Sequence, residues 1–155
     1  MGLVQANSWK KPGFLHDGFP VFNSRSVQAL QRILLETNAA VLLTTSHKTK
    51  YNLSQWRDLL RLRGISPKKL QRLTSNSLQT TRKDEILEWY GTKHTPGEEF
   101  VIIDDDKMLN GLPPDLKNKL VLTSPSIGLT DELADEAISI LKRNHSPEAA
   151  TVLSF

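Results

Sequence analysis

The segment Phe100-Val-Ile-Ile-Asp-Asp-Asp106 decides the fold, because an apolar run leads directly into three consecutive aspartates. A short, continuous apolar run is typical of a parallel strand that is buried on both faces. Two other segments have the same character, Ala39-Ala-Val-Leu-Leu-Thr-Thr45 and Leu120-Val-Leu-Thr123. Amphipathic helical patterns alternate with these runs, which predicts an α/β fold with a parallel sheet covered by helices on both faces.

Capping residues set the expected helix boundaries and the domain limits. Helices are predicted to begin after residues with N-cap chemistry, namely Ser24, Asn52 (with Gln55), Ser66, Thr81 and Thr130. Three of them are predicted to close at Asn38, Gly64 and Gly91. Residues 1–23 are expected to form a loop segment, 24–145 the α/β domain and 146–155 a C-terminal tail. Val152, Leu153 and Phe155 in that tail could dock on the body.

Length and composition describe an ordinary globular domain. The chain has 155 residues, 38% hydrophobic and 24% charged, which fits one domain with a proper core. No apolar run approaches the roughly 18 residues that a membrane span needs, and the N-terminus lacks the pattern of a secretory signal. The chain has no cysteine, which excludes a disulfide framework and thiolate chemistry. A cytoplasmic location is the default expectation.

The net charge of +3 is mild, but six basic residues fall close together in the sequence. They are Arg57, Arg61, Arg63, Lys68, Lys69 and Arg72. Such a cluster can attract a phosphate-rich partner such as nucleic acid. It can equally be a solvated helix face, which is what most basic clusters are. Both interpretations stay open.

The ends of the predicted strands carry the candidate chemistry, because ligands of parallel sheets bind beyond the carboxyl ends of the strands. The first strand ends in Thr44-Thr45-Ser46-His47-Lys48, whose hydroxyls could hold a phosphoryl oxygen. The second ends in Asp104, Asp105 and Asp106, hard oxygen ligands that suit Mg²⁺. Arg82 and Lys83 open a helix, where the helix dipole repels cations unless an anion is bound nearby. Ordinary polar strand-to-loop junctions and two solvated cations are the alternatives.

In this order, the parts resemble motifs II, III and IV of the haloacid-dehalogenase-like (HAD) superfamily. More specifically, the chain resembles the HAD domain of Swiss-army-knife RNA repair proteins, over about residues 22–142. The segments that carry the likeness are Val41-Leu-Leu-Thr-Thr-Ser-His-Lys48, Arg82-Lys-Asp-Glu-Ile86, Phe100-Val-Ile-Ile-Asp-Asp-Asp106, Leu120-Val-Leu-Thr123 and Gly128-Leu-Thr130.

The resemblance implies a Rossmann-like three-layer sandwich and Mg²⁺-dependent hydrolysis of a phosphate ester through an aspartyl-phosphate, with nucleic-acid ends as candidate substrates. It assigns phosphoryl binding to Thr45, with Lys48 nearby, and the stabilising cation to Arg82 or Lys83. It assigns Mg²⁺ to Asp104 and Asp105, and Asp106 less firmly.

The nucleophile of that superfamily has no counterpart in this sequence. The resemblance puts an Asp-x-Asp pair at the end of a central first strand, between the strands at 39–45 and 100–104. Asp17 is the one nearby candidate, and Trp9-Lys-Lys-Pro-Gly13 before it cannot form a buried strand. We therefore expect the first strand to lie upstream of Met1, its loss to open the core, and this chain to be an inactive phosphohydrolase domain. A degenerate, non-catalytic module that binds phosphate or nucleic acid is the alternative.

Overall fold

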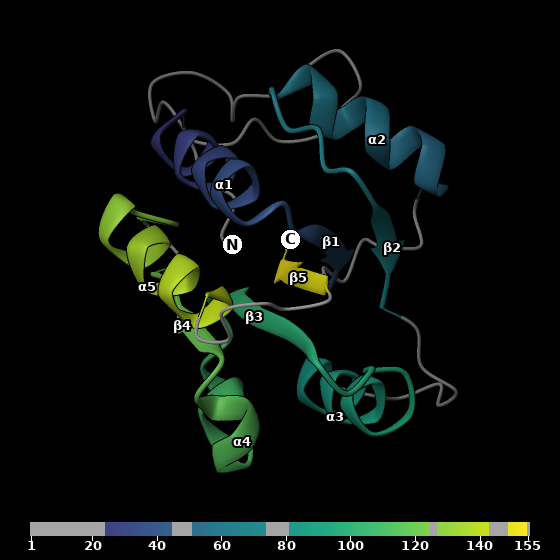
Figure 1. The fold of residues 1–155 in the computed structure, drawn as a ribbon, viewed down its shortest axis with the longest axis vertical. Coiled ribbons are helices and arrows are strands. Elements are labelled where there is room, and N and C mark those ends of the chain that lie inside the picture. The colour runs from purple at the N-terminus through teal and green to yellow at the C-terminus, as the bar shows by residue number, and fades with distance from the viewer. Residues whose placement is uncertain (1–23, 45–50, 74–80, 125–126, 143–148, 155) are drawn as a thin grey trace.

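A five-stranded parallel sheet forms the middle layer of the protein, with helices on both faces (Figure 1). The computed structural model describes residues 24–44, 51–73, 81–124, 127–142 and 149–154. The described helices are α1 (Ser24–Thr37), α2 (Leu53–Leu62), α3 (Arg82–Thr92), a 3₁₀ helix η1 (Lys107–Gly111), α4 (Pro114–Lys117) and α5 (Asp131–Leu141). The strands are β1 (Ala40–Leu43), β2 (Leu70–Arg72), β3 (Glu98–Asp104), β4 (Leu120–Leu122) and β5 (Ala149–Ser154).

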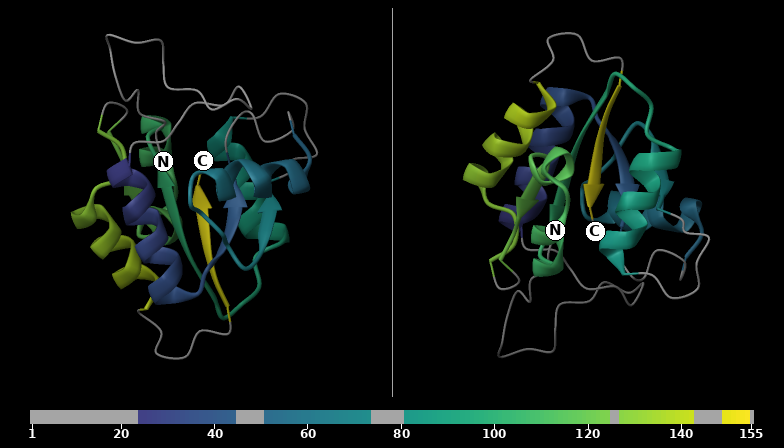
Figure 2. Two further views of the ribbon diagram at one scale, coloured as in Figure 1. Left: turned by 90° about the horizontal axis from the view of Figure 1, so that it is seen from above. Right: turned by 90° about the horizontal axis from the view of Figure 1, so that it is seen from below.

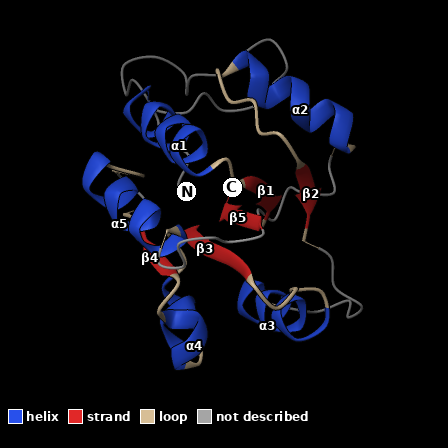
Figure 3. Cartoon of the chain, in the orientation of Figure 1, coloured by secondary structure: helices blue, strands red, loops and turns tan. Residues whose placement is uncertain are grey.

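Two apolar clusters pack the helices against the two faces of the sheet. Each strand contributes to both clusters, because its successive side chains point to opposite faces. On β1, Val41 and Leu43 face the cluster that contains residues of α1, α2 and α5. Leu42, between them, faces the cluster that contains residues of α3, η1 and α4. Figure 3 shows the same arrangement, with the strands between two groups of helices. The predicted α/β sandwich is confirmed.

The strand order is β2-β1-β5-β3-β4, so the central strand comes after all its neighbours in the chain. β5 pairs in parallel with β1, where Ala40 is opposite Thr151, and with β3, where Phe100 is opposite Thr151. Figure 2 shows β5 running between its two neighbours. Val152 and Leu153 are fully buried, one on each face. The sequence assigned residues 149–154 to a C-terminal tail. They instead form the central strand of the sheet, at the position where the sequence predicted a missing strand.

Local capping chemistry explains most helix boundaries. The Asn52 side chain accepts a hydrogen bond from the Gln55 N–H, and the Gln55 side chain accepts one from the Asn52 N–H, which completes the predicted capping box. Thr81 and Thr130 cap α3 and α5 as predicted. Gly64 has a φ of +81°, a left-handed conformation that glycine adopts without strain.

Two local expectations differ from the structure. The segment after Ser66-Pro67 was expected to be a short helix, but its residues 70–72 form the edge strand β2. Val41 N–H donates to the Lys69 carbonyl and Leu73 N–H to the Leu43 carbonyl, so pairing with β1 outweighs the local helix signal. The helix after Thr81 was expected to stop at Gly91, but α3 continues to Thr92.

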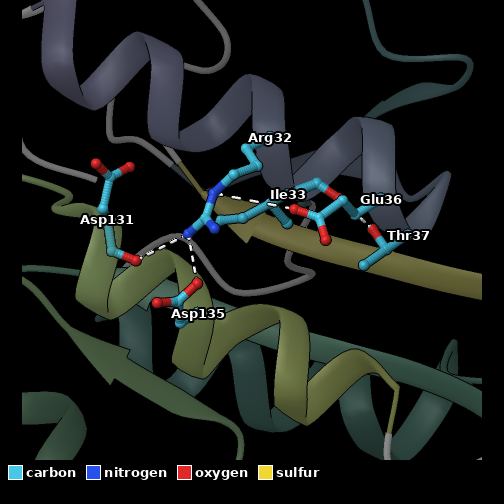
Figure 4. Close-up of polar contacts among 6 residues, drawn as sticks. All are labelled: Arg32, Ile33, Glu36, Thr37, Asp131 and Asp135. Carbon is cyan, nitrogen blue, oxygen red and sulfur yellow. Dashed lines mark hydrogen bonds and ion pairs between the residues drawn. The ribbon is translucent and has the colours of Figure 1, made fainter.

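Arg32 joins the two helices on one face of the sheet (Figure 4). Its Nη2 atom, on α1, lies 2.9 Å from the Asp131 carbonyl and 2.7 Å from the Asp135 carboxylate, both on α5. The hydrogen bond to Asp135 raises the pKa of Arg32 above its ordinary value, and Glu36 and Asp131 add to this effect. These exposed contacts link α1 and α5, whose buried residues also pack together in the larger apolar cluster.

Candidate functional site

The carboxyl ends of the strands meet at one edge of the sheet, where backbone hydrogen bonds hold them in register. Thr44, directly after β1, donates its N–H to the carbonyl of Ser154 over 3.1 Å. Thr123, directly after β4, donates its N–H to the carbonyl of Asp104 over 2.8 Å. At this edge, β1 is thus hydrogen-bonded to β5, and β4 to β3. β5 also pairs with β3, so the four strand ends lie side by side.

An ion pair between Arg82 and Asp104 forms the centre of the candidate site. Asp104 ends β3, and only 3% of its side chain is exposed. The Arg82 Nη1 atom, from the first residue of α3, donates to Asp104 Oδ1 over 2.7 Å. The Asp106 N–H donates to the same oxygen over 3.0 Å. A buried carboxylate that receives two donors is well satisfied, so the cation at the start of α3 has a partner that offsets its unfavourable position.

Arg82 and Lys83 are adjacent in sequence but diverge in space. The Lys83 amine lies beside η1, 3.1 Å from the position that a Cβ atom on Gly111 would take. Arg82 instead turns its guanidinium toward the end of β3. Sequence reasoning left the choice between these two cations open. Arg82 is the one that the structure brings to the strand ends.

Three hydroxyl groups at this edge are buried and have no hydrogen-bond partner among the described residues. They belong to Thr44, Thr123 and Ser154, each no more than 3% exposed. By the alternation along the strands, Thr44 lies on the α3 side of the sheet, together with Asp104, whereas Ser154 lies on the opposite side. An unpartnered buried hydroxyl costs about 1–3 kcal/mol. Thr44 is therefore a candidate hydrogen-bond donor for a ligand at this edge.

Sequence reasoning included Thr44 among the hydroxyls that follow the first strand, the family resemblance singled out Thr45, and both missed Ser154. Thr45 and Lys48 lie outside the described residues, as does Asp17. The signal for Thr44 was its place directly after the apolar run, where a strand ends. Ser154 could be found only by assigning Thr151-Val-Leu-Ser154 to a strand, and nothing local distinguishes that segment from a docked tail.

The three aspartates at the end of β3 offer few carboxylate oxygens for a metal ion. Asp104 is held by Arg82, and Asp106 caps η1 by accepting the Met108 N–H over 3.0 Å. Asp105, partly buried, has neither of these contacts. Within the part of the chain that the structure describes, no three His, Asp or Glu side chains are grouped to hold a metal ion. The two carboxylates that the sequence assigned to Mg²⁺ would need water or substrate oxygens to complete the coordination.

The six basic residues of the cluster do not form one surface. Arg63 is 7% exposed and donates from Nη1 to the Leu59 carbonyl at the end of α2, so it is not part of a solvated face. Arg61 pairs with Asp58 in the same helix. Arg72 donates to the Tyr51 carbonyl over 3.1 Å. Lys69 contributes to a cavity on the other side of the sheet from α2. The fold thus removes Arg63, and in part Arg72, from the solvated surface, while Arg57, Arg61, Lys68 and Lys69 stay exposed.

The comparison with protein families agrees with this arrangement. Residues 3–134 match the model of the HAD domain in Swiss Army Knife RNA repair proteins. The chain belongs to this family. No curated protein and no solved structure gave a match. The HAD-domain match covers β1, α3, β3 and β4 and ends within α5, so β5 lies beyond it. Among the described helices of this HAD domain, none is long and apolar enough to cross a lipid bilayer.

Proposed function

We propose that the carboxyl edge of this HAD domain binds the phosphoryl group of a phosphorylated substrate, with nucleic-acid ends as the candidate class. The observation that carries the proposal is the Arg82–Asp104 ion pair, which holds a guanidinium at the strand ends, on the same face of the sheet as the unpartnered Thr44 hydroxyl. Membership of a family of RNA repair proteins supports the choice of substrate class.

Arg82 suits this role because a guanidinium has five N–H donors in a rigid fork that matches phosphate oxygens. One Nη1 contact with Asp104 leaves other donors for a ligand, while Asp104 fixes the orientation of the group. The Thr44 hydroxyl would donate to a second phosphoryl oxygen, which removes the cost of its burial without a partner. Thr45 and Lys48, which follow directly in sequence, are proposed to add donors to the same oxygens. Lys83 is a weaker candidate, because its amine lies at Gly111.

Mg²⁺ is the proposed cofactor of this edge. Asp105 would hold the ion, and Asp104, whose Oδ1 atom accepts from Arg82, would contribute through water. A bound Mg²⁺ would neutralise charge on those oxygens. The ion would keep most of its coordination as water and phosphate oxygens, which is usual for Mg²⁺ in proteins.

We infer that this chain binds phosphate esters without hydrolysing them. An attack on phosphorus by the covalent route that the family resemblance implies needs a carboxylate nucleophile at the end of the central strand. The central strand here, β5, ends at Ser154, whose hydroxyl is fully buried. No described residue of β5 is acidic. A phosphate-binding module is therefore the function that this geometry supports best.

The proposal is tested by measuring phosphate affinity calorimetrically, with and without Mg²⁺. Because removing Arg82 alone would leave the Asp104 carboxylate buried and unpaired, the informative variant is the double substitution Arg82→Gln/Asp104→Asn. We expect it to lower phosphate affinity at least tenfold, and the matched control Lys83→Gln to lower it less than twofold. Unchanged affinity in the double variant would refute the site. Hydrolysis of an aryl phosphate by the unaltered chain with Mg²⁺ would refute the inference that it only binds.

A further inference from the structure

Met108, in the 3₁₀ helix η1 that follows β3, is an apolar side chain that is 52% exposed. Isolated exposed apolar side chains are common, so its position in the fold decides whether it has a role. Among the described residues, the other large apolar side chains that are exposed are Leu35, Leu62, Tyr90 and Ile127. The first three lie in the last turns of helices that lead into strands, at the amino edge of the sheet. Met108 instead follows the carboxyl end of β3, where the phosphoryl site is proposed.

Two hydrogen bonds fix the backbone of Met108 relative to the ion pair at that site. The Asp106 N–H donates to Asp104 Oδ1 over 3.0 Å, and the Met108 N–H donates to Asp106 Oδ1 over 3.0 Å. Four residues of chain span at most about 14 Å, which limits the distance between the Cα atoms of Met108 and Asp104. The next residue, Leu109, is fully buried in the cluster on the α3 side of the sheet. Met108 therefore lies close to the site, on the side from which Arg82 reaches it.

The surroundings of Met108 combine cations with an apolar surface. The Arg82 guanidinium lies at the end of β3, and the Lys83 amine lies beside Gly111 in the same 3₁₀ helix as Met108. These cations favour the anionic part of a ligand, whereas the exposed thioether favours an apolar part. Methionine is unbranched and polarizable, and its sulfur makes favourable contacts with the edges of aromatic rings. The ligand that suits both features is an anion that also carries a flat ring.

We propose that Met108 contacts the base of a nucleotide whose phosphate is bound at Arg82, so that the chain prefers a nucleotide to a phosphate ester without a base. The inference rests on the proposed function and adds the residue that selects the organic part of the ligand. Sulfur–aromatic contacts correspond to about twofold to tenfold in affinity. A thioether is only a weak hydrogen-bond acceptor, so this contact recognises the presence of a ring and discriminates little between bases.

The experiment measures three ligands calorimetrically on the full 155-residue chain with Mg²⁺. AMP and ribose 5-phosphate share a phosphate and a sugar and differ by the base, and inorganic phosphate is the third ligand. The variant Met108→Gln keeps the length of the side chain and removes the thioether. The matched control is Ile127→Gln, because Ile127 is 58% exposed and follows β4 at the same edge. Its chain continues into Leu129, which packs on the α1–α5 side of the sheet, away from Arg82. Thermal unfolding of both variants checks that the fold is intact.

We expect the unaltered chain to bind AMP at least threefold more tightly than ribose 5-phosphate. Met108→Gln should remove most of this preference and change the affinity for inorganic phosphate less than twofold, whereas Ile127→Gln should retain the preference. A preference that survives Met108→Gln, or that Ile127→Gln removes equally, would overturn the inference. If inorganic phosphate binds but AMP and ribose 5-phosphate bind equally, this inference alone fails. If none of the three ligands binds, the proposed function fails as well.

Discussion

Leu153→Ala should destabilise the protein strongly, because Leu153 lies in the central strand and is fully buried. Its side chain packs in the cluster between the sheet and α3, so truncation removes buried methyl groups and leaves a cavity. Substitutions of this kind cost about 2–5 kcal/mol. With about 5–15 kcal/mol of stability expected for a domain, this is a large fraction of the total. A loss of about 3 kcal/mol would lower Tm by about 6–12 °C for a chain of this size.

The assay is urea unfolding followed by far-ultraviolet circular dichroism, with Leu35→Ala as the matched control. Leu35 is 84% exposed on α1, and the same change there should stay within about 0.5 kcal/mol. If residues 149–154 were a loosely docked tail, the two variants would behave alike. Equal midpoints for Leu153→Ala and Leu35→Ala would therefore refute the place of β5 in the sheet.

The other predictions use the same unfolding assay. Arg82→Leu should lower the free energy of unfolding by about 3–5 kcal/mol, because it leaves the Asp104 carboxylate buried without its cation. Adding Asp104→Asn should restore most of the lost stability. A double variant no more stable than Arg82→Leu would contradict the ion pair. Gly64→Ala should cost about 1 kcal/mol at its φ of +81°. Gly91→Ala, inside α3 with open space around it, should gain about 0.5–1 kcal/mol, so a gain at both glycines would argue against the assigned backbone. Thr130→Ala should cost about 1 kcal/mol by removing the cap of α5, and Thr130→Ser should retain most of the stability.

Features with a local cause were predictable from the sequence. The apolar runs of β1, β3 and β4 appear where they were expected, since a strand buried on both faces needs a continuous apolar segment. The Asn52 capping box and the Thr130 cap were also predictable, because each depends on residues three positions apart.

Features that depend on the three-dimensional arrangement could not be predicted in this way. The segment Ala149–Ser154 has ordinary strand composition, and only its pairing with both β1 and β3 makes it central. The burial of Arg63 arises because its side chain folds back onto the α2 carbonyls, which a count of basic residues cannot show. Arg82 and Lys83 are chemically similar neighbours, and their separation follows from where α3 sits relative to β3 and Gly111.

The position of β5 has a consequence for how the chain reaches its native state. Ala40 of β1 pairs with Thr151 of β5, so these two neighbouring strands are separated by most of the domain's sequence. β1 does not pair with β3, and the half-sheets β2-β1 and β3-β4 are joined through β5 alone. Contacts of such long sequence separation slow folding, because the chain loses much of its entropy before they form. Before β5 pairs with β1 and β3, each half-sheet exposes an unpaired apolar edge. We expect the chain to be most prone to aggregation at this stage of folding.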